Sequence, residues 1–207
     1  MLVRSDNIGS LNPAGRAAMA AYGVTTVIDL RTESEVATSP GPFAAAGGEI
    51  KYLHRPMVDD STMYRLGEAP GMFERYLMML DLRPAALSDI FSAMAQAEGA
   101  VVFHCFAGKD RTGMVAAMSL ALADVELDAI AADYAETDTQ MAARYQEWLA
   151  EASPDQLEVM RQDLQCPPER IVGVLEYLGQ RWGGVDGYLE AAGVGPADIT
   201  RLASKLT

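Results

Sequence analysis

Cysteine and histidine are scarce in this sequence, and their scarcity excludes two kinds of site. The chain has two cysteines, Cys105 and Cys166, and two histidines, His54 and His104. Two cysteines cannot build a disulfide framework, which favours a reducing compartment. The histidines lie far apart, and no cysteine or acidic residue stands at metal-ligand spacing from them. We therefore expect neither a metal site nor a cofactor.

Long apolar runs are also missing. Residues 1–6 lack the apolar core of a signal peptide. The longest apolar run, residues 114–123, is shorter than the roughly 20 residues that a membrane-spanning helix needs. We therefore expect a cytoplasmic protein without integral membrane association, although export by a route without a signal peptide stays open.

Positive charge is in the minority, with 16 Lys and Arg against 29 Asp and Glu and a net charge of −13. A nucleic-acid partner would require a basic face, so we expect none. A phosphorylated substrate remains compatible with this balance, because a few basic residues can gather around a site on an acidic body. Half of the residues are hydrophobic, so we expect a single domain over residues 1–207.

The most informative stretch is residues 104–113, His-Cys-Phe-Ala-Gly-Lys-Asp-Arg-Thr-Gly, which we call the cysteine loop. Residues 100–103 before it are apolar and partly β-branched, which predicts a buried strand. Residues 114–122 after it are apolar and free of proline, which predicts a buried helix. Cys105 opens the loop and Arg111 closes it, so both belong to a strand–loop–helix unit.

This arrangement suits the binding of a phosphate. The unpaired amides of a loop that enters a helix form an anion site together with the helix dipole. Arg111 can hold two phosphate oxygens with its planar fork, and Gly108 allows a tight turn that a Cβ would hinder. The same positive environment stabilises a thiolate on Cys105, which becomes a nucleophile directed at phosphorus. The alternative is that Cys105 is only a buried structural cysteine beside an exposed basic turn. That alternative would not explain why the cysteine loop stands between a strand and a helix.

The loop has the Cys-x5-Arg form of the protein tyrosine phosphatase superfamily. Its full string resembles the bacterial and fungal tyrosine phosphatases, some of which also act on phosphoinositides. Residues 27–35, 132–137 and 187–193 are similar to the same group. The resemblance implies hydrolysis of phosphotyrosine through a phosphocysteine intermediate, with release of inorganic phosphate. Phosphoserine, phosphothreonine and phosphoinositide substrates stay open, as does action on a phosphorylated protein or on a lipid.

The resemblance also assigns roles within the loop. The loop amides and Arg111 would hold the phosphate oxygens, while the Thr112 hydroxyl would donate to the Cys105 sulfur. Lys109 could meet a second phosphate. The substrate-binding candidates are therefore Phe106, Ala107, Gly108, Lys109 and Thr112.

Two aspartates are candidates for the general acid that protonates the leaving group. Asp59 follows the expected strand 50–54 and Pro56, in a position that resembles the acid loop of the family. Its alternative role is a turn or a helix N-cap. Asp110 lies inside the cysteine loop, where its alternative role is to balance the neighbouring cations. The sequence leaves both open.

Three further expectations concern architecture and alternatives. We expect an α/β fold with a small, mostly parallel sheet of four or five strands, including residues 24–30, flanked by helices and followed by a helical C-terminal third.

The methionine-rich residues 57–80 form either a lid or, as we favour, core helices. For Arg31 we favour a structural pairing with Glu35 over a contact with the substrate. Alternatives to the enzyme are a phosphate-binding pseudophosphatase and a thiol-based oxyanion reductase, for which Cys166 is a poor resolving cysteine.

Overall fold

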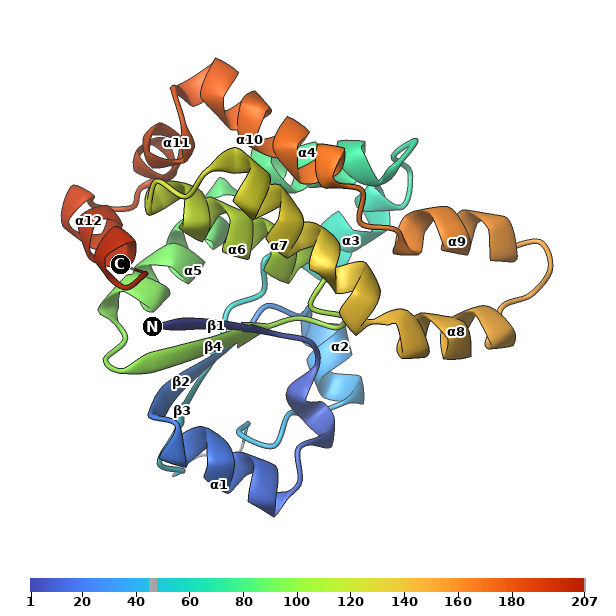
Figure 1. Cartoon of the computed structure of the whole chain (residues 1–207), viewed down its shortest axis with the longest axis horizontal. Helices are drawn as coiled ribbons and strands as arrows, with labels where there is room; N and C mark the ends of the chain where they lie inside the picture. Colours follow the sequence, from blue (N-terminus) through green and yellow to red (C-terminus); the bar gives the residue numbers. More distant parts are fainter. Residues whose placement is uncertain (45–47, 207) are drawn as a thin grey trace.

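Four parallel strands form the sheet at the centre of the protein (Figure 1). The structure, a computed structural model, describes residues 1–44 and 48–206. The strand order is β1-β4-β2-β3. The expected α/β class and parallel sheet are confirmed, but β1 was not predicted because this short edge strand is only half-buried and carries a weak pattern. The bounds are β1 Leu2–Ser5, β2 Val24–Asp29, β3 Lys51–His54 and β4 Ala100–His104.

Strand β4 is buried on both faces, as its continuous apolar sequence predicts for a central parallel strand. Val101 and Phe103 pack into the larger hydrophobic core. Val102, which points to the opposite face, joins a smaller cluster with Val24 and Val27 of β2. Strand β4, which leads into the cysteine loop, is therefore fixed between two packed layers.

Helices cover both faces of the sheet. Helix α1 (Pro13–Ala21) lies on one side, whereas α5, α6 and α7 lie on the other, under the C-terminal helices (Figure 1). Helix α2 (Glu33–Thr38) begins at the capping box that Thr32 and Glu35 form. The other helices are α3 Asp60–Leu66, α4 Met72–Leu82, α5 Pro84–Gln96, α6 Asp110–Leu122, α7 Leu127–Gln140, α8 Ala142–Glu151, α9 Leu157–Leu164, α10 Pro168–Trp182, α11 Val185–Ala192 and α12 Pro196–Ser204.

The C-terminal third is helical, as expected, and part of it leaves the body of the protein. Helices α8 and α9 extend together away from the sheet before α10 returns across it (Figure 1). None of the helices in residues 1–44 and 48–206 is both long and apolar enough to cross a membrane.

Candidate active site

The cysteine loop begins at the C-terminal end of the central strand, where parallel sheets place their ligands. In the sheet register, His104 of β4 lies between Ser5 of β1 and Asp29 of β2. Burial lowers the pKa of His104 despite the nearby Asp29 carboxylate, and its Nδ1 lies 3.2 Å from the Cys105 carbonyl oxygen. The neutral ring therefore fixes the start of the loop, and Cys105 follows it as a buried free thiol.

Gly108 makes the turn of the loop with a φ of +65°. A Cβ on Gly108 would lie 2.7 Å from the Ser5 carbonyl oxygen and 2.8 Å from the Asp6 nitrogen, so only glycine fits against the end of β1. Arg4 holds the same turn, because its Nε and Nη2 donate to the Gly108 carbonyl oxygen at 3.2 and 3.1 Å. The tight turn expected at Gly108 is confirmed.

Arg4 was not identified from the sequence. Its side chain also donates to the Asp133 carboxylate and to Thr137 Oγ1, both on α7. These partners lie more than a hundred positions away in the chain, so no local pattern could have indicated them. Arg4 thus joins β1, the cysteine loop and α7.

Arg111 is held by Glu35 in a bidentate ion pair. The distances are 2.5 Å from Nη1 to Oε2 and 2.8 Å from Nη2 to Oε1. Burial acts against the charge of Arg111, but Glu35 and the charge of Cys105 raise its pKa above the usual value. Glu35 also accepts from the Thr32 amide, so the capping box of α2 fixes the guanidinium over the loop. This second role of Glu35 could not be read from the capping pattern.

The prediction that Arg31 pairs with Glu35 is wrong, because Arg31 pairs with Asp29 instead. Arg31 is fully buried and donates from Nε and Nη2 to the Asp29 carboxylate at 2.9 and 2.6 Å. It also donates to the Ser39 carbonyl oxygen. Arg31 is thus a structural residue that joins the end of β2 to the segment after α2.

Lys109 and Asp110 interact with each other and with the helices that cover the loop. Lys109 is buried, with its Nζ bonded to the Asp163 carbonyl oxygen on α9 and 3.0 Å from Asp110 Oδ1. The same Oδ1 accepts a hydrogen bond from Tyr76 Oη at 2.5 Å. Asp110 therefore sits at the point where the loop, α4 and α9 meet.

Asp59 has the alternative role that the sequence left open. It is the N-cap of α3, where its Oδ1 accepts from the Thr62 amide at 2.7 Å and from Ser61. Its Oδ2 pairs with Arg83. The Thr62 and Ser61 hydrogen bonds, assisted by Arg83, lower the pKa of Asp59 to about 2. These contacts hold the Asp59 carboxylate at the start of α3.

Thr112 Oγ1 is buried, and within residues 1–44 and 48–206 it has no hydrogen-bond partner. The expected hydrogen bond to the Cys105 sulfur is therefore not formed in this structure. The hydroxyl lies at the first turn of α6, where it remains free to donate.

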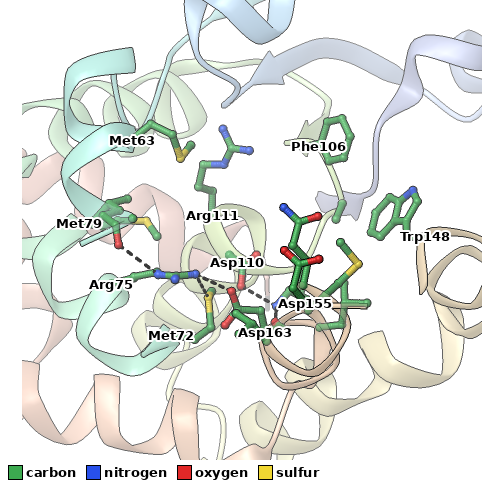
Figure 2. A pocket seen from close by; sticks show the side chains of 18 residues that line it. Met63, Met72, Arg75, Met79, Phe106, Asp110, Arg111, Trp148, Asp155 and Asp163 are labelled. Carbon is green, nitrogen blue, oxygen red and sulfur yellow. Dashed lines mark hydrogen bonds and ion pairs between the residues drawn. The ribbon is translucent and has the colours of Figure 1, made fainter. Parts of the chain in front are cut away.

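A cleft of about 640 Å³ opens above the loop (Figure 2). Phe106 stacks on Trp148 of α8 at its rim, with ring centroids 5.8 Å apart. Within the methionine-rich segment, Met57 and Met79 belong to the core, whereas Met63 and Met72 line the cleft. A lid role for this segment stays a prediction. The cleft lining also includes Met79, Arg75, Ala107, Lys109, Asp110, Arg111 and Asp163. Four of the predicted site residues are not part of it: Asp59, Cys105, Gly108 and Thr112.

The site is thus a cysteine at the end of a central strand, a glycine turn held by β1 and an arginine fixed by a carboxylate. The sequence model of the tyrosine phosphatase family matches residues 1–207, the whole chain. The chain belongs to the tyrosine phosphatase family. It is 33% identical to a tyrosine-protein phosphatase of Nostoc commune, over 99% of this chain and 73% of that protein. It is also 27% identical to the triple specificity protein phosphatase PtpB of Mycobacterium tuberculosis, over 99% of this chain and 90% of that protein.

The family membership confirms the resemblance drawn from the cysteine loop. Among residues 1–44 and 48–206, no group of three or more His, Cys, Asp or Glu side chains is arranged to hold a metal ion. The positive groups that line this phosphatase's cleft are the side chains Arg75, Lys109 and Arg111.

Proposed function

We propose that this phosphatase hydrolyses phosphotyrosine in two steps through a phosphocysteine. The Cys105 thiolate attacks phosphorus in line, the S–P bond forms and the ester P–O bond breaks. The leaving phenoxide takes a proton from a carboxylic acid. Water then attacks the phosphocysteine, the S–P bond breaks, the carboxylate recovers a proton from that water, and inorganic phosphate leaves.

The observation that carries this proposal is the Arg111–Glu35 ion pair beside Cys105. Charge accumulates on the equatorial oxygens of the phosphoryl group in the transition state. A guanidinium that is already oriented, with the loop amides, stabilises this charge without reorganisation. The loop residues Phe106, Ala107, Gly108 and Lys109 supply the amides, and Thr112 is free to stabilise the thiolate that leaves in the second step.

The contacts favour Asp110 over Asp59 as the general acid. Asp110 lines the cleft and lies next to Arg111 in the loop. Asp59 lies outside the cleft lining and is bonded by an N-cap amide and Arg83. An acid must reach the leaving oxygen within hydrogen-bond distance, so Asp110 is better placed.

Phosphoinositides are a second substrate class that the cleft could accept. The apolar side chains of Met63 and Met72 suit a lipid or a large aryl group. Lys109 would meet a second phosphate only by leaving its bonds to Asp163 and Asp110. The Lys109→Ala variant is therefore expected to lose more activity on polyphosphorylated lipids than on phosphotyrosine. Equal losses on both substrates would remove the second-phosphate role.

The test is hydrolysis of p-nitrophenyl phosphate and a phosphotyrosine peptide by wild type, Cys105→Ser, Asp110→Asn and Asp59→Asn, across roughly pH 4 to pH 8. We expect Cys105→Ser to be inactive and Asp110→Asn to lose the alkaline limb of the rate profile. Mass spectrometry of acid-quenched wild type should find a phosphoryl group on the peptide that contains Cys105.

Other results would favour the alternatives. A wild type that binds phosphotyrosine but hydrolyses nothing would be a pseudophosphatase. Arsenate reduction that requires Cys166 would indicate an oxyanion reductase. Burial raises the pKa of Cys166 to about 11, which makes it a weak resolving thiol and counts against that alternative. A lost alkaline limb in Asp59→Asn would return the general acid to Asp59.

A further inference from the structure

Two buried tyrosines lie directly behind Asp110. Tyr76 of α4 and Tyr134 of α7 are both fully buried, and their hydroxyl oxygens are 2.8 Å apart. Tyr76 Oη lies 2.5 Å from Asp110 Oδ1. Tyr134 Oη lies 3.3 Å from Arg170 Nη1 of α10. A continuous hydrogen-bond chain therefore runs from α10 through α7 and α4 to the cysteine loop.

The direction of this chain follows from its two ends. A guanidinium has donors and no acceptor, so Arg170 must donate to Tyr134. At the other end, the Asp110 carboxylate only accepts, so the hydroxyl hydrogen of Tyr76 points to Oδ1 and Tyr134 is left as the donor to Tyr76. Arg170 is held in place by the Gln165 carbonyl oxygen and by the face of the Tyr76 ring, 5.9 Å from its centroid.

Both tyrosines stay protonated over the working range of pH. Burial raises the pKa of Tyr76 well above its usual value, and the Asp110 charge adds to this effect. Burial raises the pKa of Tyr134 in the same way. The chain therefore remains a chain of donors that ends on a carboxyl oxygen.

The two oxygens of Asp110 are consequently not equivalent. Oδ1 receives Tyr76 Oη and lies 3.0 Å from Lys109 Nζ. Within residues 1–44 and 48–206, no hydrogen bond reaches Oδ2. A carboxyl proton is thus excluded from Oδ1, where two donors already point, and belongs on Oδ2.

We infer that Arg170, Tyr134 and Tyr76 are positioning residues that make Asp110 an effective proton donor in the phosphatase reaction. This inference rests on the proposed function. When Oδ2 gives its proton to the leaving oxygen, negative charge develops on Asp110. The donor chain stabilises that charge as it forms, so it stabilises the transition state more than the ground state and lowers the barrier. The segment 132–137 thereby acquires a role in the reaction through Tyr134.

Other charged and titratable groups also surround Asp110 and its tyrosines. The variants used in the test must leave these groups in place. Lys109 and Arg111 belong to its own loop and α6. Lys109 also donates to the backbone carbonyl of Asp163 on α9, whose carboxylate pairs with Arg75 of α4. The remaining groups around the acid and its tyrosines are Asp138 of α7, Tyr145 of α8, Cys166 before α10 and Arg170 of α10. Tyr76→Phe and Tyr134→Phe leave every one of these charges in place.

The experiment measures kcat/KM against pH for two esters, phenyl phosphate and p-nitrophenyl phosphate. Phenoxide is the more basic leaving group and needs the proton more. Because Tyr76→Phe removes a charge-assisted donor, we expect its kcat/KM for phenyl phosphate to fall about tenfold, with a much smaller fall for p-nitrophenyl phosphate. We expect the alkaline limb to move up by about one pH unit. Tyr134→Phe should show the same two effects at smaller size.

The matched control is Tyr177→Phe. Tyr177 is also on a helix and also donates to an aspartate, Asp81, but it lies on the surface away from the cleft. This variant should match wild type in both measurements. Equal losses on both esters with an unmoved alkaline limb in Tyr76→Phe would show a packing effect and overturn the inference. A wild type inactive on both esters would overturn the proposed function itself, and the inference with it.

Discussion

The sharpest prediction concerns Gly108, whose conformation and surroundings both exclude a side chain. A non-glycine residue in the left-handed region costs roughly 1–2 kcal/mol. In Gly108→Ala the new Cβ would also lie 2.7 Å from the Ser5 carbonyl oxygen and 2.9 Å from the Asp6 Cα. These are backbone atoms at the end of β1, so they can move only if the strand moves. Such overpacking adds about 1–3 kcal/mol.

The expected destabilisation of Gly108→Ala is therefore about 2–5 kcal/mol, measured as a loss of free energy of unfolding in urea. Activity should fall more than stability indicates, because a shift of about 1 Å in the loop can cost about a hundredfold in rate. The assay is kcat for p-nitrophenyl phosphate at a temperature where the variant is still folded by circular dichroism.

Two other glycines separate the contributions. Gly23 has a φ of +89°, but a Cβ there would have nothing within 4 Å of it, so Gly23→Ala should show only the conformational cost. Gly179 lies inside α10 with open space around it, so Gly179→Ala should stabilise the protein by about 0.5–1 kcal/mol. If Gly108→Ala is no less stable than Gly23→Ala and keeps wild-type kcat, the close approach of β1 does not shape the loop.

Two further predictions concern the residues that hold the loop and its arginine. Glu35→Gln should lower kcat/KM about tenfold, because Arg111 loses its ionic anchor. Despite burial, Arg111 lowers the pKa of Glu35 below its usual 4.5, so the stabilisation from this pair is present above that pH and disappears as pH falls below it. Urea unfolding should therefore show a weaker loss of stability below about pH 4.5 in the variant than in wild type; parallel profiles would contradict the pairing. Arg4→Ala should lower kcat about tenfold and regain part of it when guanidinium ion is added, whereas no rescue would mean that Arg4 acts only through stability.

Much of the fold was predictable because its signals are local. The capping box at Thr32 and Glu35 is a local signal for the start of a helix, and the short apolar run before Cys105 favours a buried strand. Strand β1 was missed because four half-buried residues at a sheet edge carry little periodicity, and it becomes a strand only through its pairing with β4.

The partners of the charged side chains were less predictable. Arg31 and Glu35 stand at helix spacing, which favours pairing between them. In the folded chain each finds a better partner, Asp29 for Arg31 and Arg111 for Glu35. Bidentate geometry and burial decide which ion pair forms, and neither can be predicted from the spacing of the residues along the sequence.

The sequence by itself determined the family and the proposed phosphate site. Cys105 and Arg111 stand at a fixed spacing between a strand and a helix, and such a site is built from backbone amides and side chains that are close in the chain. Only the tertiary structure separates the two candidate acids of the proposed reaction. Asp59 and Asp110 are equivalent as residues, but one caps α3 beside Arg83 while the other ends a donor chain from α10, α7 and α4. The environment of a carboxyl group, and hence its readiness to give up a proton, comes from groups that only folding brings together.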